Sequence, residues 1–143
     1  MSYDINLCDP VTKETIEFDA PHNMRGGMYQ IGGSTEAWLN VTYNYADWYY
    51  MDGVFGKDNK DNKGIRTLYG MSGAESIPVL KHAISVLENS KKELTEKEKN
   101  EYKQHDAGGY WTPTRTNAIK PLYQLLAFAQ MRPDGIWNGD VIS

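Results

Sequence analysis

The chain has 143 residues, a formal charge of −4 at neutral pH, and 40% hydrophobic and 24% charged residues. This length and composition correspond to one folded domain with a real core, and they exclude a disordered chain. The acidic balance argues against a binder of nucleic-acid phosphates, and no apolar run reaches the roughly 20 residues of a membrane span. A single cysteine excludes internal disulfides, and the N-terminus shows no apolar leader, so we expect one domain over residues 1–143 in the cytoplasm.

The N-terminal part of the chain predicts a small antiparallel sheet. Residues 3–8 alternate apolar and polar side chains, a turn begins at Asp9 and Pro10, and residues 15–18 resume the alternation. This pattern is typical of a β-hairpin. A short third strand is expected over residues 28–31, between glycine pairs.

A helix is predicted over residues 35–51, with Ser34 or Thr35 as its N-cap. Four apolar residues share one face at helical spacing, namely Trp38, Val41, Tyr45 and Trp48. Tyr43 and Asn44 fall on its other faces. Such a helix either packs on two sides or offers a recognition surface.

Two further helices are predicted in the second half of the chain. Ser72 and Glu75 match a capping box for a helix that runs to about residue 88, and the last helix is expected over residues 116–131. The apolar face of the first consists of Ile77, Leu80, Ile84 and Leu87, and that of the second of Ile119, Leu122, Tyr123, Leu126 and Ala129. A turn at residues 133–135 then folds Ile136 and Trp137 back against the body.

The remaining segments are polar. Residues 56–64 repeat an Asp-Asn-Lys tripeptide and predict a flexible surface loop, and residues 88–106 form an exposed charged segment with a second capping box. Residues 65–69 are expected to be a short strand or extended chain. The fold class is therefore α+β, with a small N-terminal antiparallel sheet of a hairpin and a short third strand, packed against three main helices.

Neither a metal nor a hydrolase site is predicted. His22, His82 and His105 are scattered without ligand spacing, and one cysteine cannot build a thiolate site. Ser72 lies between an extended apolar stretch and a helix, as in a nucleophile elbow, but no Asp lies between it and His105. The capping box explains Ser72 better, so we expect no catalytic residue, no cofactor and no enzyme.

The arginines form the most suggestive pattern. The four of them, Arg25, Arg66, Arg115 and Arg132, each stand beside Gly, Pro or a helix start, whereas the lysines crowd the polar segments. Arginine presents a planar charged fork to phosphate or carboxylate, and helix N-termini add backbone N–H groups. With aromatic residues to stack on a base, the predicted ligand-binding set is Arg25, Gly26, Gly27, Ser34, Thr35, Trp38, Tyr43, Asn44, Trp48, Arg66, Ser72, Trp111, Arg115 and Arg132. The alternative is that these arginines are salt-bridged loop anchors.

Four stretches of the chain resemble a group of small uncharacterised proteins of Gram-positive bacteria and their phages. They are residues 21–27 (PHNMRGG), 35–45 (TEAWLNVTYNY), 70–78 (GMSGAESIP) and 131–137 (MRPDGIW). The resemblance covers nearly the whole chain and transfers no catalytic residue. It implies a phage or prophage accessory protein, a class that often disarms host defences.

The resulting hypothesis is a counter-defence protein that captures a small anionic, nucleotide-like ligand without turnover. One alternative is a protein–protein inhibitor of a host defence protein, in the manner of an anti-CRISPR. Another is a small hydrolase that uses Ser72. An aromatic-rich surface is also compatible with a homodimer.

Overall fold

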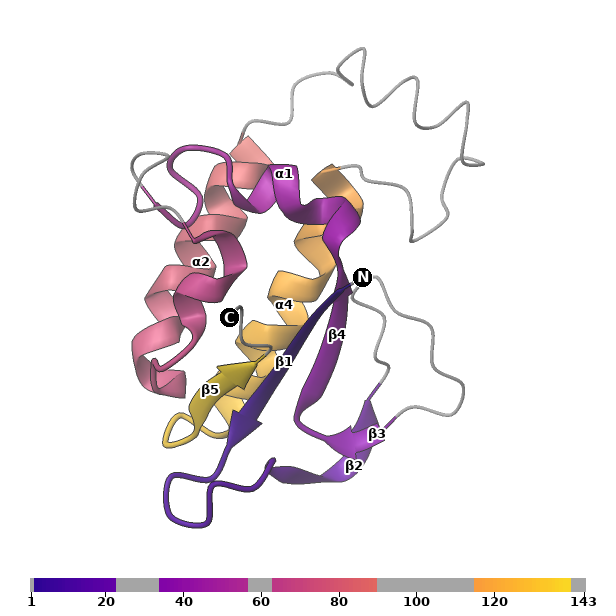
Figure 1. Cartoon of the computed structure of the whole chain (residues 1–143), viewed down its shortest axis with the longest axis vertical. Coiled ribbons are helices and arrows are strands. Elements are labelled where there is room, and N and C mark those ends of the chain that lie inside the picture. Colours follow the sequence, from indigo (N-terminus) through magenta and orange to yellow (C-terminus); the bar gives the residue numbers. More distant parts are fainter. Residues whose placement is uncertain (1, 23–33, 57–62, 90–114, 140–143) are drawn as a thin grey trace.

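The structure is a computed structural model and describes residues 2–22, 34–56, 63–89 and 115–139 (Figure 1). It confirms the α+β class. The strands are β1 (Ser2–Cys8), β2 (Glu17–His22), β3 (Ser34–Glu36), β4 (Trp38–Thr42) and β5 (Ile136–Gly139). The α-helices are α1 (Ala46–Tyr49), α2 (Gly73–Asn89) and α4 (Arg115–Met131), and two 3₁₀ turns are η1 (Tyr43–Tyr45) and η2 (Gly64–Leu68). Of the α-helices, α2 and α4 are long and α1 is a single turn.

Strand β1 is the centre of a three-stranded antiparallel sheet with the order β4-β1-β5. Its alternating pattern places Tyr3, Ile5 and Leu7 in the core, while Asp4 is exposed. In Figure 1 the sheet crosses in front of α4, with α2 running beside α4. The core therefore lies between the inner face of this sheet and the two long helices.

The predicted hairpin is present only at its base. Cys8 and Thr15 form an isolated bridge, and Ile16 donates its backbone N–H to the carbonyl of Leu7 at 2.9 Å. Beyond this point β2 leaves β1 and pairs with β3 in a separate two-stranded sheet. The neighbours of β1 come instead from residues far away in the chain, which local turn signals do not reveal.

The helix predicted over residues 35–51 is wrong for its first half. Residues 34–36 and 38–42 are strands β3 and β4, and helical turns begin only at Tyr43. Ala37, Leu39 and Val41 are buried at every second position, which is the period of a strand. Trp38 and Val41 also have helical spacing, so this stretch fits both a helix and a strand. Its pairing with β1 selects the strand. Ser34 and Thr35 therefore cap no helix.

The predicted bounds of helices α2 and α4 agree with the observed bounds to within about one residue. Ser72 Oγ accepts the backbone N–H of Glu75 at 3.0 Å, and Glu75 Oε1 accepts that of Ser72 at 2.9 Å, which confirms the capping box. The expected apolar faces are buried, with two differences: Ile77 is half-buried, and Tyr123 is 50% exposed. Tyr123 lies at the edge of its face and donates its hydroxyl to Glu88 of α2.

The C-terminal turn brings the end of the chain into the sheet. Gly135 donates its N–H to the carbonyl of Arg132 at 3.0 Å, as expected of a tight turn, and β5 then pairs with β1. Trp137 is 1% exposed, and its Nε1 donates to Ser76 Oγ at 2.7 Å. The expected return of Ile136 and Trp137 to the body is thus a full strand.

The other predicted segments are only partly described. Residues 65–69 are neither a strand nor extended: they belong largely to η2, where Ile65 and Leu68 are both buried at the three-residue spacing of a 3₁₀ turn. Of the predicted polar loop of residues 56–64, only residues 56, 63 and 64 belong to the described part of the chain. The strand over 28–31 lies outside the described residues, as does the charged segment of residues 88–106 beyond Asn89.

Candidate functional site

The segment from Tyr43 to Trp48, formed by η1 and the start of α1, contains three of the predicted site residues, and two predicted arginines lie against it. Thr42 caps it, since its Oγ1 accepts the backbone N–H of Asn44 at 3.2 Å. Tyr45 and Tyr49 hold it from beneath: both are buried, and Tyr49 Oη donates to the carbonyl of Ala118 at 2.8 Å. We call this stretch the 43–48 segment.

Arg66 of η2 lies against the first residue of the 43–48 segment. Its Nη2 donates to Tyr43 Oη at 2.9 Å, and its Cζ lies 4.7 Å from the ring centroid of Tyr3 and 5.5 Å from that of Tyr43. The two tyrosine rings meet edge to face at 4.6 Å. A half-buried guanidinium held over two aromatic faces gains cation–π attraction and keeps its charge at this place.

Arg115 lies against the other end of the segment. It is the first residue of α4 and only 5% exposed, and its Cζ lies 5.8 Å from the ring of Trp48. Two residues further on, Asn117 is also buried and accepts the Nζ of Lys120 at 3.2 Å. Buried polar side chains are uncommon, so this end of α4 is distinguished from an ordinary core helix.

Five predicted residues are thus brought together, namely Tyr43, Asn44, Trp48, Arg66 and Arg115. Asn44 is exposed, and Tyr43, Trp48 and Arg66 are half-buried, so these side chains reach solvent, whereas Arg115 is buried against the ring of Trp48. Tyr3 and Asn117 were missed by the sequence analysis. Tyr3 had the pattern of a core strand residue, and a buried asparagine in a helix carries no local signal.

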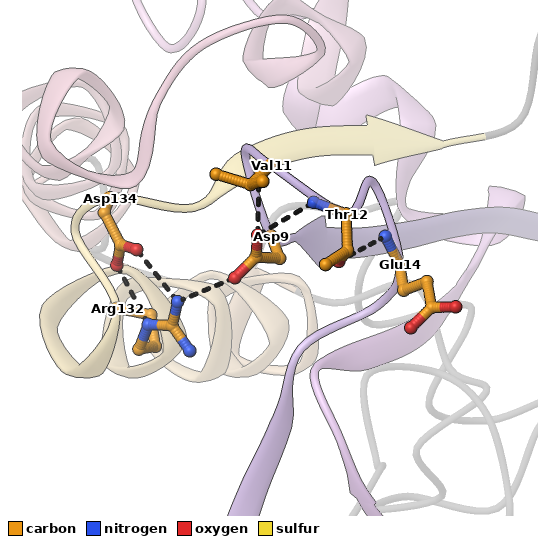
Figure 2. A network of polar contacts seen from close by, with 6 residues as sticks. All are labelled: Asp9, Val11, Thr12, Glu14, Arg132 and Asp134. Atoms are coloured by element: carbon orange, nitrogen blue, oxygen red, sulfur yellow. Dashed lines mark hydrogen bonds and ion pairs between the residues drawn. The ribbon is translucent and has the colours of Figure 1, made fainter.

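Arg132 lies elsewhere and has structural partners (Figure 2). Its Nε and Nη2 donate to the two carboxylate oxygens of Asp134 at 2.9 and 2.8 Å, and Nη2 also reaches Asp9 at 3.4 Å. Asp9 follows β1 at the end opposite Tyr3, six residues away, which is about 20 Å along a strand. Arg132 therefore does not join Arg66, and it ties the turn at residues 9–14 to the end of α4.

These contacts predict an acid-sensitive stabilisation. Backbone N–H groups of Thr12 and Val11, together with Arg132, hold the pKa of Asp9 below its ordinary value of 3.8, and the Arg132 hydrogen bond does the same to Asp134. Carboxylates with a lowered folded-state pKa stabilise the fold above 3.8, and this contribution is lost as the pH falls through the folded pKa. Arg132→Gln should therefore lower the melting temperature at pH 7, and the deficit should shrink toward pH 2.

Circular dichroism melts of both proteins between pH 7 and pH 2 measure this deficit. Lys63→Gln, the loss of an exposed cation, serves as the control and should show a small difference at every pH. A deficit for Arg132→Gln that stays constant down to pH 2 would contradict the role of the two carboxylates.

The remaining predicted residues do not join the 43–48 segment. Ser72 is engaged in the capping box at the start of α2, and Trp38 lies half-buried in β4, paired in register with Asn6. The backbone of Ser34 and Thr35 lies in β3. Arg25, Gly26, Gly27 and Trp111 lie outside the described residues.

Two hollows that the described residues form lie away from this segment. One, of about 430 Å³, is bordered by Val54, Phe55 and Val79, and there His82 Nε2 lies 2.9 Å from the carbonyl oxygen of Gly53. The other, of about 330 Å³, lies between α2 and α4. Neither of these two hollows is lined by a residue of the 43–48 segment.

Within the described ranges no group of three or more metal-ligating side chains occurs, and no helix there is long and apolar enough to cross a membrane. No family model, curated protein or solved structure matches the chain.

Proposed function

We propose that this protein binds a small anionic, nucleotide-like ligand on the 43–48 segment and does not turn it over. The observation that supports it most is the placement of two arginines, Arg66 and Arg115, against aromatic residues at the two ends of one short segment. Arg132 is not part of this arrangement, because it joins Asp134 and Asp9 at the turn that follows α4.

The chemistry of each residue suits this role. The guanidinium of Arg66, which donates to Tyr43 Oη, is a planar, charged fork of N–H donors. It would take a phosphate or carboxylate group. Trp48 presents an indole for stacking on a base, with Arg115 beneath it to fix the ring, and Asn44 would hydrogen-bond the polar edge of the ligand.

Binding without turnover fits the residues that surround the segment. Apart from the exposed carboxylate of Asp47, which lies within the segment itself, the side chains of Tyr43, Asn44, Trp48, Arg66 and Arg115 supply no carboxylate, histidine or thiol to act as a general base or nucleophile. Capture requires only affinity and protein concentration. In the phage setting that the sequence resemblance implies, removal of a nucleotide signal would disarm a host defence.

We expect one class of linear or cyclic nucleotide to raise the melting temperature of the protein. A ligand at about 100 times its Kd adds about 2.7 kcal/mol to the free energy of unfolding, a shift that thermal scanning detects readily. In Arg66→Gln the affinity for that ligand should fall about tenfold or more, because a charged hydrogen bond is lost. Isothermal titration of the compound that gives the largest shift measures this change.

Two further variants complete the test. Arg132→Gln removes an arginine at the other end of β1 and should bind as the wild type does. Asn44→Ala changes an exposed side chain and keeps the site testable even where Arg66→Gln fails to fold. Unchanged affinity in both Arg66→Gln and Asn44→Ala would overturn the assignment of the site. A panel with no shift would contradict a nucleotide ligand and favour the protein–protein inhibitor.

A further inference from the structure

The outer surface of the α2–α4 pair carries a regular charge pattern. Lys81, Ser85 and Glu88 are exposed along α2 at positions i, i+4 and i+7, so they share one face of the helix. This face borders the hollow of about 330 Å³, whose apolar lining is Ile84 and Leu126. A cation and an anion thus stand on either side of a polar centre, about 10 Å apart along the helix.

The same surface exposes one large aromatic side chain, that of Tyr123. Among the described residues the exposed large hydrophobic side chains are Val11, Tyr50, Tyr123 and Met131, and the last two both belong to α4. Tyr123 is 50% exposed, and Met131, 55% exposed, lies eight residues further along α4 and about 80° around the helix from it. Tyr123 also lines the hollow and donates its hydroxyl to Glu88.

We propose that this face pairs with the same face of a second copy of the chain, with the two α2 helices antiparallel. A two-fold axis near Ser85 places Lys81 of each copy opposite Glu88 of the other, so both charge pairs are satisfied at once. Glu88 accepts the hydroxyl of Tyr123, so the Lys81 ammonium of the second copy also approaches an aromatic ring.

The charge order selects a second copy over other occupants. A two-fold rotation exchanges the positions of the positive and the negative charge. In a second copy related by this rotation, each positive charge therefore faces a negative one. A polyanion such as nucleic acid would require positive charges along the whole groove, without the negative charge of Glu88. Burial of Tyr123 and the rim of the hollow adds the apolar contribution that exposed ion pairs alone do not supply.

The test uses the complete chain and reversed charges. The wild type should be a dimer by size exclusion with light scattering and by sedimentation equilibrium. Lys81→Glu should place two carboxylates against each other at both ends of the interface, and Glu88→Lys should do the same with two ammonium groups. Each single variant should raise the dimer Kd by about tenfold or more.

The antiparallel register makes a sharper prediction. An equimolar mixture of Lys81→Glu and Glu88→Lys should form a heterodimer, because the charges of the first complement those of the second at both ends. The double variant Lys81→Glu/Glu88→Lys should again form a homodimer. Lys63→Glu, an equal charge reversal on another exposed lysine, should leave the dimer intact.

Several results would overturn the proposal. A monomeric wild type at high micromolar concentration would do so, as would a dimer that neither single variant weakens. Single variants that stay monomeric when mixed, while circular dichroism shows them folded, would exclude this register. Because ligand binding at the 43–48 segment is measured separately, failure of either proposal leaves the other standing.

Discussion

Trp137→Ala is expected to destabilise the protein by about 3–5 kcal/mol, a large part of the total stability of a typical domain. The indole is 1% exposed and fills the core between β5 and α2. Its removal leaves a cavity and deprives Ser76 Oγ of the Nε1 donor at 2.7 Å. For a chain of this length the melting temperature should fall by roughly 10 °C or more.

Denaturant unfolding followed by circular dichroism measures this loss, and two variants show its origin. Trp137→Phe keeps most of the ring volume and loses only the N–H, so it should cost less. Trp38→Ala removes an indole that is half-buried in the same sheet and should also cost less. A cost for Trp137→Ala no greater than that for Trp38→Ala would contradict the position of Trp137 in the core.

Gly73→Ala should destabilise the protein by about 2 kcal/mol, although alanine is the better helix former. Gly73 is the first residue of α2 and donates its N–H to the carbonyl of Gly135 at 2.7 Å. A Cβ at this position would lie 2.7 Å from the carbonyl oxygen of Arg132 and 3.0 Å from Cα of Pro133. Both atoms belong to the backbone of the turn, which cannot move aside without breaking its bonds to α2.

The neighbouring residue supplies the matched control. Ala74 is exposed, so Ala74→Gly should cost no more than the intrinsic difference of about 1 kcal/mol. Helix propensity alone predicts that Gly73→Ala stabilises and that Ala74→Gly is the worse of the two. Thermal unfolding that follows this order would show that the turn at residues 132–135 does not lie against α2 as described.

The sequence predicted which types of residue form the candidate site, but not which of the predicted residues lie together. The position of each arginine beside a helix start or turn marked Arg66, Arg115 and Arg132 equally. Only the register of β1 with β4, in which Tyr3 lies opposite Val41, places Tyr43 beside Tyr3 and under the guanidinium of Arg66. The same sheet separates Arg132 from them, because Asp9 and its partner lie at the other end of β1.

Local chemistry was sufficient where the determining contacts are short-range. The capping box of Ser72 and Glu75, the apolar stripe of α4 and the turn before β5 all depend on residues within a few positions of one another. Their hydrogen bonds and side-chain spacing are encoded in the sequence itself, and the structure confirms them.

Tertiary structure decided the segments whose sequence fits two periods. Residues 35–51 satisfied a helical spacing, yet Ala37, Leu39 and Val41 also alternate as in a strand, and only the N–H and C=O groups of β1 settle the choice. Strand β1 also pairs with β5, which comes from the far end of the chain, whereas β2 pairs with β3 in the other sheet. The pairings of β1 with β4 and β5 join residues more than thirty positions apart, where the free energy of burying two faces together outweighs any local preference. By itself the sequence determined the α+β class, the helices α2 and α4 and the capping box of α2, whereas long-range pairing determined the sheet order and which arginines meet the 43–48 segment.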